Sequence, residues 1–176
     1  AGVVKSYPTK SVRDLGVLYG FFRRDDYVMG GRKISLQTLE RKFIQGKEFS
    51  EPRIHFAIVC ASLSCPKLSK KVFRVETLEA QLTESARQFV GERRNVLVEG
   101  ETVTLSEIFK WYDSDFRWKA PSVIEFVKLY AAPELKAKID AIAKPKVKFV
   151  DYDWSINDPG SRAKAKSSYE RELAKS

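Results

Sequence analysis

The stretch that decides the predicted fold is RIHFAIVCASLSCPKL, residues 53–68. Its centre, FAIVCA, is an uninterrupted apolar run, which is typical of a strand covered on both faces. The same stretch holds the only histidine of the chain, His55, and its only two cysteines, Cys60 and Cys65. We therefore expect residues 53–60 to form a central buried strand, with the most reactive side chains of the protein on it or just after it.

Helices and hairpins are predicted on both sides of this strand. One amphipathic helix should follow the capping residue Ser35, and a second should cover 77–90 and end at Gly91. The residues expected on the core face of the second helix are Leu78, Leu82, Ala86 and Phe89. The other predicted elements are hairpins at 27–34 and 95–105, a helix at 107–112 capped by Ser106, a helix at 123–131 opened by Pro121 and Ser122, and a strand at 146–154. This order indicates an α+β fold with a small central antiparallel sheet packed by helices.

Composition and charge fit one globular domain with a basic surface. We expect a single α+β domain over 1–158 and a flexible basic tail over 159–176, which is polar and rich in small residues. The net charge of +9 would suit either nucleic-acid binding or a solvated basic surface. The basic residues are scattered and no nucleic-acid motif accompanies them, so we favour the solvated surface.

Membrane spans, metals and cofactors are not predicted. No apolar run approaches the ~20 residues that a membrane-spanning helix needs. The first residues, AGVVKSYPTK, show no signal peptide. A chain that had lost one would look the same and would be extracytoplasmic, so the location stays open. The spacing C-x4-C with one histidine upstream does not match the common zinc sites.

His55 and Cys65 are the residues expected to form a base and nucleophile pair. A straight strand would hold His55 and Cys60 ~16 Å apart and on opposite faces, whereas the loop that follows can bring Cys65 back toward the histidine. Pro66 favours a helix start, which would make Cys65 an N-cap where the helix dipole stabilises a thiolate. Cys60 is kept as the alternate nucleophile, for a strand that bends at Ala61.

A histidine base needs an orienting acid, and Glu40 is the first candidate. The apolar arc of its predicted helix consists of Leu36, Leu39, Phe43 and Ile44. Glu40 falls inside that arc, where a carboxylate is costly unless it is paired. An equally weighted alternative places Glu40 at the edge of the arc, reaching water.

A late acidic segment offers other candidates for the same role. Asp151, Asp153 and Asp158 could orient the histidine in place of Glu40, or could bind a cation. A solvated edge followed by a turn at 157–160 is the favoured interpretation.

Four motifs resemble the domain-of-unknown-function family numbered 547. They are VMGGRKISLQTLE, EPRIHFAIVCASLSCPKL, TLSEIFKWYDSDF and FVDYDWSIND, and the likeness runs from about Val4 to Asp158. The resemblance implies a papain-like, circularly rearranged cysteine-hydrolase fold, related to that of transglutaminases, with a Cys-His-Glu triad. By position this implies Glu40, His55 and one of the two cysteines. Relatives carry an aromatic-rich helical segment upstream, and this chain is expected to begin just past it.

The predicted function is therefore a thiol hydrolase or acyl-transferase acting on amide or peptide bonds. A thiolate would attack the carbonyl and form a thioester, and His55 would serve as general acid and base. Backbone N–H groups near the cysteine would hold the oxyanion. The alternatives are a non-catalytic protein-interaction module on the same fold and, less favoured, a basic nucleic-acid-binding domain.

Overall fold

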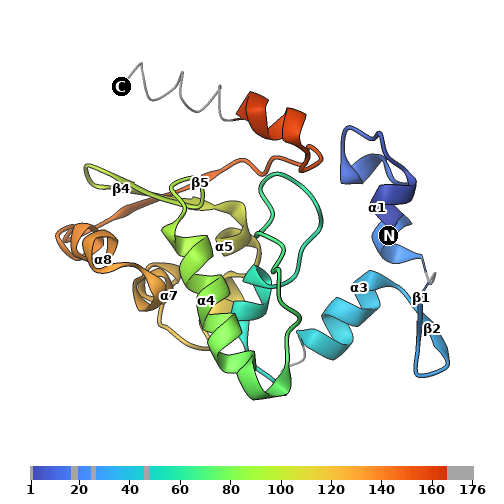
Figure 1. The fold of residues 1–176 in the computed structure, drawn as a ribbon. Helices are drawn as coiled ribbons and strands as arrows, with labels where there is room; N and C mark the ends of the chain where they lie inside the picture. Colours follow the sequence, from blue (N-terminus) through green and yellow to red (C-terminus); the bar gives the residue numbers. More distant parts are fainter. Residues whose placement is uncertain (1, 17–19, 25–26, 46–47, 166–176) are drawn as a thin grey trace. The chain divides into compact units, whose positions relative to one another are not determined.

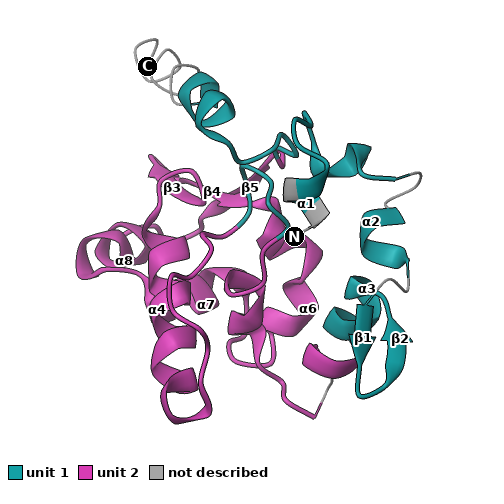
Figure 2. Cartoon of the chain, turned by 45° about the vertical axis from the view of Figure 1, so that its right-hand side comes forward, with its two compact units in different colours: residues 1–41, 60–65, 153–176 teal, residues 42–59, 66–152 magenta. Residues whose placement is uncertain are grey.

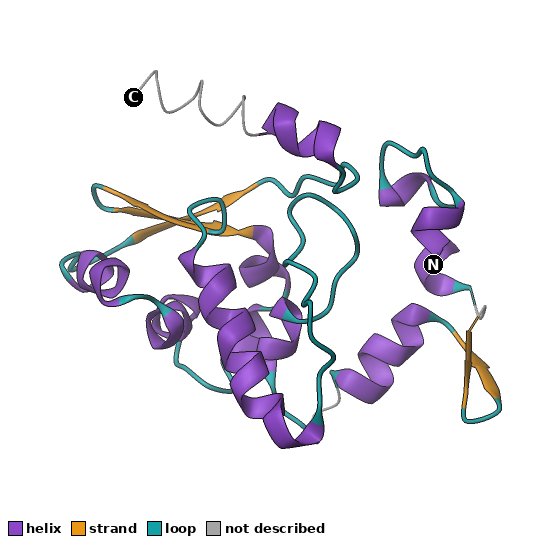
Figure 3. Cartoon of the chain, in the orientation of Figure 1, coloured by secondary structure: helices purple, strands orange, loops and turns teal. Residues whose placement is uncertain are grey.

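The computed structural model describes residues 2–16, 20–24, 27–45 and 48–165 (Figure 1). The chain divides into two compact units, each assembled from segments that are distant in sequence. Unit 1 takes residues 1–41, 60–65 and 153–176, and unit 2 takes residues 42–59 and 66–152 (Figure 2). Helices and small sheets occur together in the structure, which confirms the predicted α+β class (Figure 3).

The sheet of unit 2 has three strands in the order β3-β4-β5. Strand β3 (Val96–Glu99) pairs antiparallel with β4 (Thr102–Ser106), as the predicted hairpin requires. Strand β5 (Lys146–Val150) pairs with β4 in parallel. The prediction of an antiparallel sheet is therefore wrong for β5, because the chain passes through several helices before it returns, and such a long crossover permits parallel pairing.

Five helices of unit 2 surround this sheet and its core. They are α4 (Leu78–Gly91), α5 (Glu107–Trp111), α6 (Asp113–Phe116), α7 (Val123–Tyr130) and α8 (Pro133–Asp140), with a short 3₁₀ turn, η5 (Val75–Thr77), before α4. The predicted cap of α5 is confirmed, because the Ser106 hydroxyl accepts from the N–H of Ile108. Helix α7 begins after Ser122, as predicted, and the Ser122 hydroxyl accepts from the N–H of Glu125.

The core face predicted for α4 is confirmed except at its first residue. Leu82, Ala86 and Phe89 are buried, whereas Leu78 is 41% exposed. Leu78 begins the helix, so its side chain lies at the exposed end rather than over the core.

The predicted central strand over 53–60 is wrong. Pro52–Phe56 form a 3₁₀ helix, η4, and the residues that follow up to Cys60 are irregular. The Glu51 side chain accepts from the N–H of Arg53, and Pro52 occupies the first helical position. An apolar run predicts burial without separating strand from helix, and here the local cap and the proline decide the conformation.

Unit 1 contains the hairpin predicted at 27–34. Strands β1 (Tyr27–Met29) and β2 (Arg32–Ile34) pair antiparallel around Gly30 and Gly31, which have φ of +56° and +76°. Two positive φ angles are those of a type I′ turn, which glycine adopts without strain.

Short helical segments flank that hairpin. They are α1 (Gly2–Lys5), η1 (Val12–Asp14), α2 (Gly20–Arg23) and α3 (Leu36–Thr38), which continues as a π-helical segment, η3 (Leu39–Ile44). The Ser35 hydroxyl accepts from the N–H of Thr38, which confirms the predicted cap of α3.

The predicted flexible tail begins as a helix. Residues 159–165 are helical, and the Asp158 carboxylate accepts from the N–H of Ser161 at 2.7 Å, as an N-cap does. The remainder of the predicted tail, 166–176, lies outside the described residues. Within the part of the chain that the structure describes, no helix is both long enough and apolar enough to cross a membrane.

Candidate functional site

His55 lies in η4 of unit 2, buried beside a carboxylate. Its Nε2 is 2.9 Å from Oδ2 of Asp115, a residue of α6. The imidazole stacks on the ring of Tyr112 with centroids 3.7 Å apart and contacts the edge of Phe116. A carboxylate can only accept, so the neutral ring carries its proton on Nε2 and keeps a lone pair on Nδ1.

Burial lowers the pKa of His55 below its ordinary value of 6.5, and the hydrogen bond that the ring donates to Asp115 opposes this shift only in part. The ring is therefore neutral at neutral pH. Among the residues that the structure describes, none forms a hydrogen bond with Nδ1. A neutral imidazole held in one tautomer, with a lone pair on its second nitrogen, has the form of a general base.

This pKa shift predicts a loss of stability in mild acid. The unfolded chain takes up a proton near pH 6.5 while the folded protein resists it, so stability is complete above that pH and falls as the pH drops toward the folded pKa. The slope from one such group is at most about 1.4 kcal/mol per pH unit. Urea unfolding at about pH 7 and about pH 5 should show a larger loss for the wild type than for His55→Gln. Equal losses in the two proteins would show that the buried imidazole is not the titrating group.

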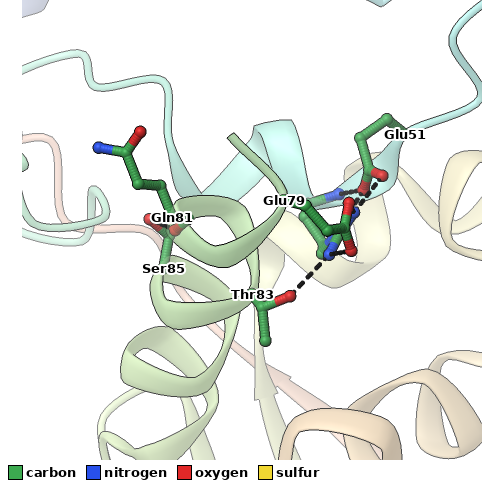
Figure 4. Close-up of polar contacts among 6 residues, drawn as sticks. Glu51, Glu79, Gln81, Thr83 and Ser85 are labelled. Atoms are coloured by element: carbon green, nitrogen blue, oxygen red, sulfur yellow. Dashed lines mark hydrogen bonds and ion pairs between the residues drawn. The ribbon is translucent and has the colours of Figure 1, made fainter. Parts of the chain in front are cut away.

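An ion-pair network fixes the turn that carries His55. The Arg53 guanidinium binds Glu51 through Nε and Nη2, at 2.7 and 2.6 Å, and binds both carboxylate oxygens of Glu79 on α4. Its Nη1 also donates to the Thr83 hydroxyl at 2.7 Å (Figure 4). These contacts raise the pKa of Arg53 above its usual range. They tie η4 to the side of α4, and so they set the position of the histidine.

The two cysteines form a close pair in unit 1. The Sγ atoms of Cys60 and Cys65 are 3.2 Å apart, and the backbone N–H of Cys60 donates to Sγ of Cys65 at 2.8 Å. Cys65 is 3% exposed and Cys60 is partly exposed. The Ser62 hydroxyl lies 3.0 Å from the sulfur of Cys60.

The helix predicted to begin at Pro66 is absent, since residues 66–70 are irregular and the next helical turn begins at Val75. Cys65 is therefore not an N-cap, and the helix whose dipole was expected to stabilise its thiolate does not form there. Proline is tolerated at the first position of a helix, but it does not by itself start one. The basic stretch that follows, KLSKK, also lacks an apolar face that a helix could bury.

Glu40 lies in η3, on the helical segment that was expected to present an apolar face. None of the residues of that arc is buried, and Phe43 is 50% exposed. Among the residues that it describes, the structure therefore shows no fully buried apolar face around Glu40. The pairing of Glu40 with His55 stays a prediction, because the two residues belong to different units.

Asp151, Asp153 and Asp158 lie on a solvated edge that ends in a capped turn, in agreement with the favoured interpretation. Asp151 and Asp153 are exposed, and the Asp153 carboxylate accepts from the N–H of Ser155 at 2.8 Å. Asp158 caps the helix that starts at Pro159. Among the described residues, no group of three or more histidine, cysteine or acidic side chains is arranged to hold a metal ion.

Asp115 and Tyr112 are the site residues that the sequence interpretation missed. Tyr112, Asp115 and Phe116 follow one another at helical spacing within TLSEIFKWYDSDF, so a carboxylate falls among aromatic residues on one face. The argument applied to Glu40, that a carboxylate on an apolar face needs a partner, would have marked Asp115 as a residue that needs a partner, without naming His55 as that partner.

Comparison with known proteins identifies the family. Residues 3–90, half of the chain, match the family described as "Protein of unknown function, DUF547". The matched region includes Glu40, His55 and both cysteines, whereas Asp115 lies beyond it. Comparisons with curated proteins and with solved structures gave no match. The chain therefore belongs to the DUF547 family of proteins of unknown function.

Proposed function

We propose that this protein is a thiol hydrolase or acyl-transferase acting on amide or peptide bonds, with His55 as the general base and one cysteine as the nucleophile. The observation that carries the proposal is the 2.9 Å contact between Nε2 of His55 and the Asp115 carboxylate among aromatic side chains. A neutral ring held in this way keeps Nδ1 ready to accept a thiol proton.

The reaction would proceed in two balanced steps. The sulfur attacks the carbonyl carbon as its proton passes to Nδ1 of His55, and the imidazolium then protonates the leaving amine to give a thioester. Water or an acceptor amine then attacks the thioester carbon as His55 takes its proton, the C–S bond breaks, and the imidazolium returns the proton to the leaving sulfur, which releases the acid or the new amide. His55 and Cys60 are only five positions apart, so the chain limits their Cα atoms to about 18 Å. The mechanism requires that the ring and a sulfur meet when substrate is bound.

We assign the orienting role to Asp115. Its carboxylate holds the Nε2–H tautomer and would offset the positive charge of the imidazolium during catalysis. Glu40, the acid implied by the family resemblance, stays the alternative for this role.

Cys60 is the better candidate for the nucleophile. The preference for Cys65 rested on a helix start at Pro66 that the structure does not contain. Cys60 is also the more exposed of the two thiols, so a carbonyl carbon can reach it more easily. Cys65 then becomes its neighbour, 3.2 Å away, and is the alternate nucleophile.

We further propose that the fold is a papain-like, circularly rearranged cysteine-hydrolase core, as the motif resemblance implies. The α+β composition agrees with this proposal. The parallel β4–β5 pairing and the irregular chain after Cys65 are departures from the arrangement expected here. An experimental structure aligned with known papain-like cores would test the assignment.

Acylation by p-nitrophenyl acetate tests the chemistry without a known substrate. The wild type should form a thioester on Cys60, seen as an added acetyl group by intact mass, with release of p-nitrophenolate. Cys60→Ser should abolish the adduct, and His55→Gln should slow its formation by about 10²-fold or more, because general-base catalysis contributes that much. Asp115→Asn should slow acylation as well, because an amide can donate to Nε2 and so favours the wrong tautomer.

A matched carboxylate on the same helix provides the control. The Asp113 side chain is 41% exposed and pairs with Arg117, so Asp113→Asn should leave the acylation rate unchanged. Circular dichroism should show that each variant keeps its fold. Equal acylation rates in the wild type and in folded His55→Gln would overturn the catalytic proposal and favour a non-catalytic interaction module.

A further inference from the structure

The cysteine pair of unit 1 is held in place by the chain around it. The N–H of Leu63 donates to the carbonyl of Ser155 at 2.9 Å, and the N–H of Ser64 donates to the carbonyl of Asp153 at 3.2 Å. The Ser64 hydroxyl in turn accepts from the N–H of Asp153 at 2.9 Å. These contacts fix the loop between the two cysteines against a segment about ninety residues later in the chain.

The loop also turns the two sulfurs toward each other. Ala61 has a φ of +65°, a left-handed conformation that non-glycine residues seldom adopt. The N–H of Cys65 then donates to the carbonyl of Ser62 at 3.2 Å, which closes the turn. As a result the Sγ atoms lie 3.2 Å apart. A disulfide needs them about 1 Å closer, a distance that side-chain rotation can supply.

We propose that Cys60 and Cys65 form a reversible disulfide by exchange with small-molecule disulfides. The thiolate of Cys60 attacks one sulfur of the small disulfide, which breaks its S–S bond and releases one small thiol. Cys65 then attacks the sulfur of Cys60 in this mixed disulfide and releases the second small thiol. Two protein thiols lose two electrons in total, and one small disulfide is reduced to two thiols.

The order of attack follows from exposure and from hydrogen bonding. Cys60 is partly exposed and can meet an incoming disulfide, whereas Cys65 is 3% exposed. Sγ of Cys65 receives the backbone N–H of Cys60 and lies next to the Cys60 sulfur. A nearby sulfur with a directed N–H donor is well placed to act as the resolving thiolate.

Incubation of the reduced full chain with oxidised glutathione tests this proposal by intact mass. The wild type should lose two hydrogen atoms and gain no glutathione, and dithiothreitol should reverse the change. Cys65→Ser should instead accumulate one glutathione on Cys60, because the resolving thiol is missing. Cys60→Ser should react at least tenfold more slowly than Cys65→Ser, because its remaining thiol is buried.

Two results would overturn the proposal: a wild type that stays reduced, or one that accumulates the mixed disulfide with glutathione without forming the disulfide between Cys60 and Cys65. Thermal melting of both serine variants, compared with the reduced wild type, should give similar midpoints if the substitutions leave the fold intact. The measurement needs neither a substrate nor His55, so its outcome is independent of the proposed hydrolase activity. If both proposals hold, the disulfide removes the nucleophile, and acylation by p-nitrophenyl acetate should stop on oxidation and return with dithiothreitol.

Discussion

Replacing Arg53 by alanine is expected to lower the free energy of unfolding by about 3 kcal/mol, the lower end of the range for breaking a buried ion pair. The Arg53 side chain is 7% exposed and binds the largely buried Glu51. Its removal leaves the Glu51 carboxylate buried beside the space that the guanidinium filled, and it removes the packing of the aliphatic stem. Urea unfolding monitored by circular dichroism measures the effect.

The network offers its own control. Glu79 is 81% exposed, so water replaces its contact with Arg53, and Glu79→Gln should change stability little. The double variant Arg53→Ala, Glu51→Ala should lose less than the sum of the single losses, because it leaves no buried charge behind. A loss below about 1 kcal/mol for Arg53→Ala would place the network in the class of surface ion pairs.

The substitution Arg53→Ala should also affect the candidate site. Arg53 and His55 share the single turn η4, whose start is fixed by the Glu51 cap. When the guanidinium is removed, η4 loses its tie to α4, and the imidazole loses the support that places it over Tyr112. We therefore expect the acylation rate of Arg53→Ala to fall more than its remaining folded fraction explains.

Elements governed by local rules were predictable from the sequence. The glycine pair at Gly30 and Gly31, the caps Ser35, Ser106 and Ser122, and the periodicity of α4 each depend on residues within one or two turns. Their predicted positions are confirmed because no distant partner is needed to decide them.

Long-range partners were not predictable in the same way. The bond between His55 and Asp115 joins residues that are 60 positions apart, and the contact of Ser64 with Asp153 joins residues that are 89 apart. The apolar run after His55 predicted burial correctly for Phe56 but could not separate a strand from a 3₁₀ turn. The site therefore depends on packing between distant segments, which the pattern of a single stretch does not contain.

Phe56→Ala is expected to lower the free energy of unfolding by about 3–5 kcal/mol, the range for truncating a buried phenylalanine. Phe56 is 1% exposed and stacks on Phe89 and Phe116 with centroids 4.6 and 5.6 Å apart. It also contacts Phe109 and Phe126. Alanine would leave a cavity at the centre of this cluster, which lies wholly within unit 2.

Phe49 is the matched control, because it is the same residue type, belongs to the same unit and is 62% exposed. Phe49→Ala should stay within about 0.5 kcal/mol of the wild type, and Phe56→Leu should lose less than Phe56→Ala because it refills most of the cavity. Chemical denaturation of the three variants measures the differences.

Because Phe56 follows His55 directly in η4, the same cluster that stabilises unit 2 also holds the histidine backbone. Similar small losses for Phe56→Ala and Phe49→Ala would mean that η4 is not anchored by this core, and the histidine would then need another source of rigidity.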